Sequence, residues 1–340
     1  NARNDIYVDG LRDPGNSSRE VFAVEQIEIY KGPGSTISGR GTPGGAINVI
    51  TKKPFDDRNF FNLSTTFGTD GQKRVTADVN QVLNPGVAVR ANVLYHDSDV
   101  AGRDFAHDER WGGQFAVTLK PSSDFKFIID YYRYRTSGIP DWGVPINTNT
   151  RVPWTESGIS RNTWVGNAMR DFIRNDQDII TGTAEWKIAP GITLSSKTRY
   201  GATMSEYVAS SMGALANPNV ATNVGAPNRH QDTTLAGNQT DLTLKFATGE
   251  WKHTVVAGVE ITQERMGRYA FSGLQAQTTI LSNPNPYRGF ANVGPLTQTY
   301  AATIDSKSAY ILDTIKLSPQ WIINGGVRVD NYNRAQESNT

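Results

Sequence analysis

Apolar and polar side chains alternate along most of this chain. From about residue 58 onward the dominant period is two residues, which is typical of β-strands that have one apolar and one polar face. In residues 239–247, for example, Leu242, Leu244 and Phe246 alternate with polar neighbours. The pattern predicts about eleven strands. We place them near residues 58–69, 73–83, 87–97, 110–120, 125–136, 177–188, 192–204, 239–247, 251–266, 304–317 and 320–333.

The connections between these segments are alternately short and long. The short ones have the composition of tight turns: Asn84-Pro85-Gly86, Pro121-Ser122-Ser123, Ala189-Pro190-Gly191, Thr248-Gly249-Glu250 and Ser318-Pro319. The long ones fall near residues 98–109, 137–176, 205–238 and 267–303. In an antiparallel sheet this alternation puts every long connection on the same rim, as in outer-membrane barrels. A soluble sandwich or propeller is the alternative, but loops of about 30 to 40 residues are uncommon there.

The hydropathy of the chain is compatible with a barrel. No run approaches the roughly 18 consecutive apolar residues of a membrane-spanning helix, and the mean hydropathy is -0.46. Barrel strands alternate, so their mean hydropathy stays low even when one face meets lipid. Aromatic residues near strand ends, such as Tyr131, Trp186 and Trp251, favour an interfacial girdle.

Charge and composition exclude several other classes. The 34 Lys and Arg nearly balance the 33 Asp and Glu, so nothing indicates nucleic-acid binding. The chain has no Cys, which excludes a disulfide framework, a thiolate metal site and a cysteine nucleophile. Its four His residues lack a short metal-ligand spacing, and we expect no protein-bound metal or other cofactor.

The first 57 residues have a different character. Two strand-like pieces at residues 5–9 and 26–30 precede a glycine run and a third strand at residues 46–51. Gly39 to Gly44 fits the letter of a dinucleotide-binding motif, but a strand follows it where that motif opens a helix. A phosphate-binding P-loop is also excluded, because Arg40-Gly41 stands where Lys and Ser or Thr are needed. Glycines here instead allow tight turns and close chain approach.

Three ordered motifs in this region resemble a known family. They are the run Val24 to Pro33 (VEQIEIYKGP), the glycine-rich run Ser35 to Gly45, and the run Ile47 to Pro54 (INVITKKP). Together they closely resemble the end of the plug domain of TonB-dependent receptors. Tyr7 to Gly15, followed by Arg19-Glu20, is similar to the plug of siderophore receptors, particularly those for catecholates. The close resemblance covers about residues 5–54.

The resemblance implies an all-β-dominated fold in two parts. Residues 1–57 would be the C-terminal part of a small α+β plug, and residues 58–340 the first half of an antiparallel transmembrane barrel of about 22 strands. A short helical turn would follow Lys31. The chain lacks a starting Met and a signal peptide and stops just after a strand-like run, so we expect it to be cut at both ends.

The same resemblance implies a transport function in the Gram-negative outer membrane. The expected cargo is an iron–siderophore complex, and the expected partners are TonB, through a missing N-terminal segment, and outer-membrane lipid and lipopolysaccharide. Glu25, Glu28 and Arg40 would help to seat the plug in the barrel. A ferric catecholate is anionic and aromatic, so we seek cations and stacking rings for it. The ligand candidates are Arg12, Asp13, Asn16, Ser17, Ser18, Arg103, His107, Arg110, Trp142, Arg151, Trp154 and Trp164.

Alternatives remain at two levels. A passive porin would have a similar barrel but no preceding plug. An outer-membrane enzyme would need a nucleophile or an acid–base pair, and no recognisable motif such as G-x-S-x-G occurs. Haem, cobalamin and hydroxamate siderophores are alternative cargoes. Ser17 and Ser18 stand where some hydroxamate receptors carry aromatic residues, which disfavours that cargo.

Overall fold

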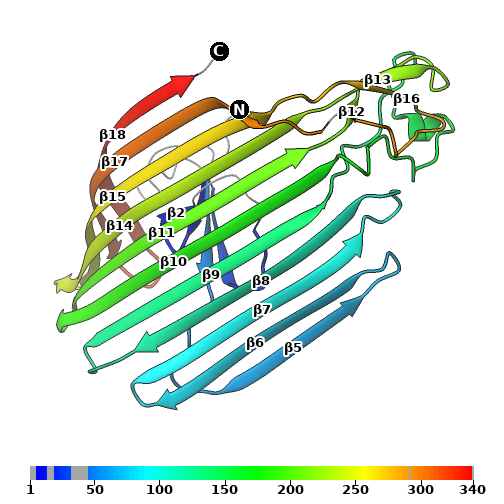
Figure 1. The fold of residues 1–340 in the computed structure, drawn as a ribbon. Helices are drawn as coiled ribbons and strands as arrows, with labels where there is room; N and C mark the ends of the chain where they lie inside the picture. Colours follow the sequence, from blue (N-terminus) through cyan, green and yellow to red (C-terminus); the bar gives the residue numbers. More distant parts are fainter. Residues whose placement is uncertain (1–4, 14–18, 32–44, 291, 339–340) are drawn as a thin grey trace.

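The computed structural model describes residues 5–13, 19–31, 45–290 and 292–338. Figure 1 shows a large curved sheet with a small sheet behind it. The small sheet lies within the first 57 residues, the predicted plug. It has the order β2-β1-β4-β3 and is formed by β1 (Asp5–Val8), β2 (Leu11–Arg12), β3 (Val24–Lys31) and β4 (Gly45–Thr51). The large sheet consists of β5 (Phe60–Phe67), β6 (Lys73–Asn84), β7 (Val87–Asp99), β8 (His107–Leu119), β9 (Phe125–Ile139), β10 (Phe172–Ala189), β11 (Ile192–Val208), β14 (Asn228–Thr248), β15 (Trp251–Phe271), β17 (Leu296–Lys316) and β18 (Ile322–Ser338).

The plug sheet is mixed. β4 pairs in parallel with β1 and antiparallel with β3. Gly45 opens β4 with a φ of +123°, and a Cβ atom at this position would collide with the carbonyl oxygen of Tyr30. The last residue of the predicted glycine run is therefore a glycine for steric reasons. The helical turn predicted after Lys31 lies outside the described residues.

The large sheet confirms the predicted antiparallel strands. Its eleven strands follow the chain order, and each pairs antiparallel with the next. The five predicted short turns all lie on one rim, and the long loops lie on the other together with the five-residue connection between β5 and β6 (Figure 1). Within the described residues the sheet is not closed, because β5 and β18 are its two edges. This open arc is the predicted part of a barrel.

Several strands are longer than predicted, and by more than one residue only at the long-loop rim. β14 begins at Asn228, whereas the alternating pattern begins at residue 239, and β10, β11, β15, β17 and β18 are also extended. The run from Asn228 to Asn238 is mainly polar on both faces. A strand that has left the hydrocarbon layer is no longer required to alternate, so hydropathy does not mark its true end.

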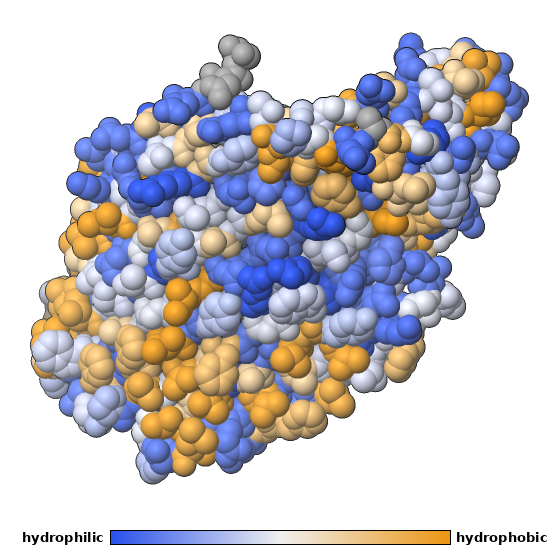
Figure 2. Space-filling model, in the orientation of Figure 1, coloured by the Kyte–Doolittle hydropathy of each residue, from blue (hydrophilic) through white to orange (hydrophobic). Residues whose placement is uncertain are grey.

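The large sheet has a polar, buried inner face and an apolar, exposed outer face, which is the reverse of a sheet in a soluble protein. Gln114 and Asp130 are 3% and 4% exposed, whereas their neighbours Phe115 and Tyr131 are 51% and 44% exposed. Figure 2 shows hydrophobic side chains gathered on the lower part of the outer face, towards the short turns. An apolar outer band with a polar interior is the pattern of a membrane barrel. In the described ranges, no helix combines the length and apolar character needed to cross a bilayer.

The plug packs on the inner face of the large sheet. Glu20 of the plug binds Arg74 on β6, and Arg12 of the plug lies 3.9 Å from Glu264 on β15. These strands are seven spacings apart in the sheet, which would be roughly 34 Å if the sheet were flat. One small plug reaches both, so the sheet curves around it. Gly39 to Gly44, which we predicted inside this curve, lie outside the described residues.

An apolar contact helps to fix the plug against the sheet. Phe22 of the plug stacks on Tyr132 of β9 with ring centroids 5.7 Å apart. Both belong to a buried cluster that joins the plug to β7, β9 and β10 and consists of Phe22, Ala23, Leu94, Tyr132, Tyr134 and Ile179. Gly112 on β8 makes room for this contact, because a Cβ atom there would lie 2.8 Å from the Phe22 ring.

The long loops form a module of their own. β12 (Ser211–Met212), β13 (Ala221–Gly225) and β16 (Gln277–Ile280) form a three-stranded sheet at one end of the rim (Figure 1). A short 3-10 helix, η1 (Trp154–Ser157), packs beside it. Trp154, Val165, Leu215 and Leu281 make a buried apolar cluster that joins three loops. The loops are therefore held by their own core.

We expect Gly112→Val to displace Phe22 and loosen the plug. Overpacking of this kind typically lowers the free energy of unfolding by about 1–3 kcal/mol. Gly113→Val is the matched control, because Gly113 points to the opposite face and a Cβ atom there meets nothing closer than 3.9 Å. Thermal unfolding and protease sensitivity of the plug in the purified full-length protein measure the effect. Equal losses in the two variants would contradict this assignment.

Candidate functional site

The predicted plug apex is tied down by ion pairs. The side chain of Asp13 accepts two hydrogen bonds from the guanidinium of Arg19. Burial alone would lower the pKa of Arg19, but the charge and hydrogen bonds of Asp13 outweigh it and raise that pKa. Arg12 faces Glu264 of β15 at 3.9 Å. Three further ligand candidates, Asn16, Ser17 and Ser18, lie outside the described residues.

Glu20 joins the apex to the inner wall. Its carboxylate accepts hydrogen bonds from Arg74 Nη2 at 2.8 Å and from Arg110 Nη1 at 2.6 Å. Burial would raise the pKa of Glu20, but the hydrogen bonds and charges of Arg74 and Arg110 outweigh it and lower that pKa. Arg110 was predicted to contact the ligand. The structure places it in contact with the plug, with a second bond to Asp108.

A second set of charges holds the opposite end of the plug. The backbone oxygen of Val8 accepts a hydrogen bond of 2.8 Å from Arg199, a residue of β11 that is 2% exposed. Asp9 pairs with Lys53 at 3.2 Å and lies 3.7 Å from Arg199. Burial would raise the pKa of Asp9, but these cations and two hydrogen bonds from Thr51 outweigh it and lower that pKa. A cavity of about 500 Å³ adjoins this cluster, with Lys53 and Lys197 on its wall.

The three predicted seating residues have different environments. Glu25 accepts a hydrogen bond of 2.9 Å from Arg90 on β7 and so reaches the inner wall. Glu28 bonds to Tyr30 and Asn48, at 2.9 Å each, within the plug sheet. Arg40 lies outside the described residues.

Three of the predicted loop residues hold the loops together. Arg103 makes two hydrogen bonds to Asp141, of 2.8 and 2.7 Å, and so links the loop at residues 100–106 to that at 140–171. The indoles of Trp154 and Trp164 are 7% and 3% exposed and donate hydrogen bonds to backbone oxygens. Rings buried in this way are not free to stack on a ligand unless the loops open.

The remaining loop candidates occupy separate positions. Trp142 is 48% exposed. Arg151 is exposed at the tip of its loop, with a φ of 61°. His107 pairs with Asp97 and Asp99 at 3.2 and 3.1 Å. His96, which precedes Asp97, is buried on the inner face, so this pair lies on the outer face and His107 does not face the plug.

Trp142 belongs to a group with two strand residues that the sequence analysis missed. Its ring centroid lies 5.5 Å from that of Tyr207 on β11, and the guanidinium of Arg229 on β14 lies 5.5 Å from the Tyr207 ring. Tyr207 and Arg229 are direct partners in the sheet. Arg229 shares its face with the buried Gln231, so the group lies on the inner face, towards the loops.

A similar group continues on the next strands. Arg268 of β15 stands 5.9 Å over the ring of Tyr300 on β17, whose hydroxyl accepts a hydrogen bond of 2.5 Å from Arg334 on β18. Arg268 is opposite Gln231, which again indicates the inner face. We call these two groups the upper wall: Trp142, Tyr207, Arg229, Arg268, Tyr300 and Arg334. Most of its members lie in the strand extensions that hydropathy did not reveal, and this is why they were missed.

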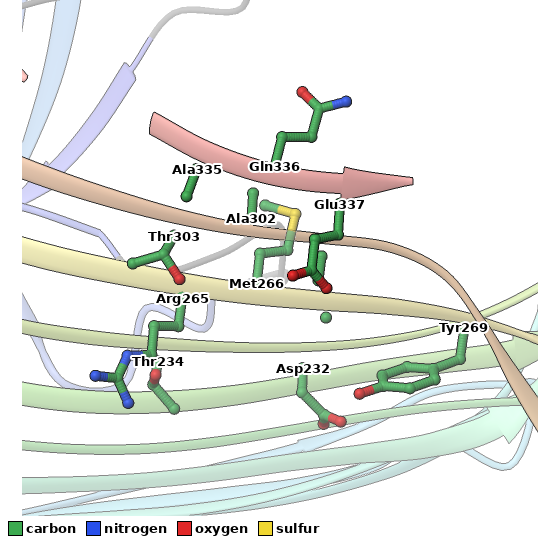
Figure 3. Close-up of a pocket in the computed structure, with 12 residues that line it drawn as sticks. Asp232, Thr234, Arg265, Met266, Tyr269, Ala302, Thr303, Ala335, Gln336 and Glu337 are labelled. Atoms are coloured by element: carbon green, nitrogen blue, oxygen red, sulfur yellow. The ribbon is translucent and has the colours of Figure 1, made fainter. Parts of the chain in front are cut away.

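A cavity of about 650 Å³ lies where β14, β15, β17 and β18 run side by side (Figure 3). Its wall includes Asp232, Thr234 and Arg265. Glu264 faces Arg12 of the plug, so the adjacent Arg265 points to the outer face. Thr234 and Arg265 are partners in the sheet and share that face. This side of the cavity is turned away from the plug, and we do not assign the ligand to it.

The Glu20 contacts predict an acid-sensitive plug. A carboxyl group whose pKa is lowered by folding stabilises the folded state above its ordinary pKa of 4.5 and loses this contribution as the pH falls through the lowered pKa. We therefore expect Glu20→Gln to lower the free energy of unfolding of the plug by about 3–5 kcal/mol at pH 7, because two arginines lose their shared carboxylate. Below pH 4.5 the difference in plug stability between Glu20→Gln and the unaltered receptor should shrink.

Plug protection from protease across pH 3 to 7 measures this effect in the full-length receptor. Glu250→Gln, in an exposed short turn, is the control and should leave the pH profile unchanged. A difference between Glu20→Gln and the unaltered receptor that is as large at pH 3 as at pH 7 would refute the linkage.

Comparison with known proteins identifies the family. Residues 110–340 match the model described as "TonB dependent receptor-like, beta-barrel", and residues 1–46 match the TonB-dependent receptor plug domain. The chain is 32% identical over 356 residues to the probable TonB-dependent receptor BfrD of Bordetella pertussis. The match covers 98% of the chain and 47% of BfrD.

Solved structures agree with this fold. The open form of the ferric-catecholate import receptor Fiu from Escherichia coli K12 matches with a TM-score of 0.89 and 29% identity, over 99% of the chain and 54% of Fiu. The siderophore receptor PiuA from Acinetobacter baumannii matches with a TM-score of 0.87 and 26% identity, over 98% of the chain and 50% of PiuA. The chain spans about half the length of the curated relatives that it matches. It belongs to the TonB-dependent receptors, a family of transport receptors in the outer membrane of Gram-negative bacteria.

Proposed function

We propose that the chain is part of a receptor that imports a ferric siderophore across the outer membrane. The upper wall carries this proposal, because it offers three arginines and three aromatic rings on the inner face, beside the extracellular loops. The ligand would lie between the plug apex, the upper wall and the loops. Arg12, Trp142 and Arg151 remain our candidates for direct contact among the predicted residues.

The chemistry of the upper wall favours an anionic aromatic ligand. Arginine pairs with ligand oxygens and also stacks on rings, and tyrosine and tryptophan provide further stacking surfaces. A ferric catecholate has both the negative charge and the rings, whereas a neutral ferric hydroxamate lacks the charge. The names of Fiu, a ferric-catecholate import receptor, and PiuA, a siderophore receptor, support the same cargo class.

The proposed function also implies an energy source for transport and a set of partners. Transport would be driven by TonB through a segment that precedes this chain, and iron would arrive in its own chelator, with no protein-bound cofactor and no catalytic step. The apolar outer band would contact lipid. Above it, Arg133 and Arg135 lie on the outer face beside Asp176 and Asp178, where they would meet lipopolysaccharide.

We expect Arg268→Gln to weaken binding of a ferric catecholate. Loss of a hydrogen bond to a charged group costs about 1.5–3 kcal/mol, or roughly 10- to 150-fold in affinity. Arg174→Gln is the matched control: Arg174 has the same charge and also lies near the loop end of a strand, but it pairs with Glu206 on the outer face. Fluorescence quenching or calorimetry on the full-length receptor measures both.

A second ligand tests the choice of cargo. A neutral ferric hydroxamate should bind less tightly than the catecholate and should respond little to Arg268→Gln. Equal or tighter binding of the neutral complex would overturn the catecholate assignment. Equal losses for Arg268→Gln and Arg174→Gln would remove the upper wall from the ligand site.

A further inference from the structure

Three extracellular loops meet at a buried arginine outside the ligand site described above. Arg170 ends the loop at residues 140–171, and its side chain is 1% exposed. Its Nε donates a hydrogen bond of 2.9 Å to Asp171, and its Nη2 donates one of 2.8 Å to Ser210 in the next loop. Its Nη1 is buried and has no hydrogen-bond partner among the described residues. An unpaired buried donor on a charged group is costly, so this position has unmet bonding capacity.

A second buried arginine comes from the third loop. Arg288 is 7% exposed and donates to three neutral oxygens: the side-chain oxygen of Gln277 at 3.2 Å, and the backbone oxygens of Asn285 at 2.6 Å and Val165 at 2.9 Å. Within the described ranges no carboxylate lies within ion-pair distance of Arg288. A guanidinium has five N–H donors, so further donors remain for a ligand.

Both arginines line one cavity of about 480 Å³. The exposed Gln275 and Thr278 also line it, which places its mouth at the loop surface. Arg170, Arg288 and Asp171 together carry one excess positive charge in a largely buried setting. The pKa of Arg288 is accordingly lowered, mainly by burial, and the repulsion of Arg170 adds to this against the attraction of Asp171.

We propose that this cavity is an oxyanion-binding site, which takes a phosphate or carboxylate group through Arg170 and Arg288. The anion would neutralise the excess charge and occupy the free N–H donors. Because Arg170 reaches Ser210 and Arg288 reaches Val165, a bound anion would also hold the three loops together. The cavity shares no lining residue with the upper wall, and the proposal does not depend on the identity of the cargo.

Binding of inorganic phosphate to the purified full-length receptor tests this site. Calorimetry at constant ionic strength, with chloride as the balancing ion, should show saturable binding. Phosphate should also slow proteolysis in the loops at residues 209–227 and 272–295. Arg288→Gln should weaken phosphate binding at least tenfold. Arg161→Gln, which removes the same charge from an exposed position in the 140–171 loop, should leave the affinity unchanged.

A surface variant covers the case in which Arg288→Gln does not fold. Gln275→Glu keeps the shape of an exposed cavity residue but adds a negative charge at the mouth, and it should also weaken phosphate binding at least tenfold. Competition by lipopolysaccharide or by ferric siderophore would support the site and identify the source of the oxyanion. Absence of phosphate binding, or binding that neither variant weakens, would overturn the proposal.

Discussion

Successive side chains in a strand point to opposite faces, and this constraint determines where the large sheet can place its charges. The outer face carries exposed apolar side chains such as Phe115, Tyr131 and Ile261, so polar residues of the same strands must face inward. An inward arginine such as Arg199 is then buried with few water molecules to solvate it. The plug supplies the missing partners: the backbone of Val8 for Arg199 and the carboxylate of Glu20 for Arg74 and Arg110. The plug therefore provides partners for charged side chains of the inner face that would otherwise need water.

A plug held mainly by charges differs from one held by an apolar core. The attraction within a buried ion pair exceeds the desolvation free energy of its charges by little, although removal of one partner is strongly destabilising. The contacts of Glu20, Asp9 and Glu25 thus fix the position of the plug more strongly than they add to its net free energy of association. Its apolar anchor is the small cluster around Phe22 and Tyr132. Such an interface is specific, and it leaves the plug separable from the wall when an outside force acts on it.

The sequence predicted the fold better than the site. Period-two alternation and turn composition located all eleven strands, because lipid imposes alternation wherever a strand crosses the membrane. Beyond the hydrocarbon layer that constraint ends, so Tyr207, Arg229 and Tyr300 were assigned to loops although they lie on strands. Trp154 and Trp164 were correctly located in a long loop, but sequence alone does not distinguish a ring available to a ligand from one in a loop core. Burial depends on three loops at once, and no local pattern encodes it.

The apex contacts a strand that also carries part of the upper wall, which would give a physical route between a ligand and the plug. On β15, Glu264 faces Arg12, and Arg268 lies four residues further along the same face, about 13 Å away along the strand. An anion bound near Arg268 would attract Arg12 and compete with Glu264 for it. Within the apex, Arg19 forms an ion pair with Asp13, and the adjacent Glu20 forms an ion pair with Arg74 on the inner face of the sheet. Arg12 is only eight positions from Glu20, so on the proposed function a shift of Arg12 towards a ligand would couple ligand charge to plug seating through neighbouring ion pairs.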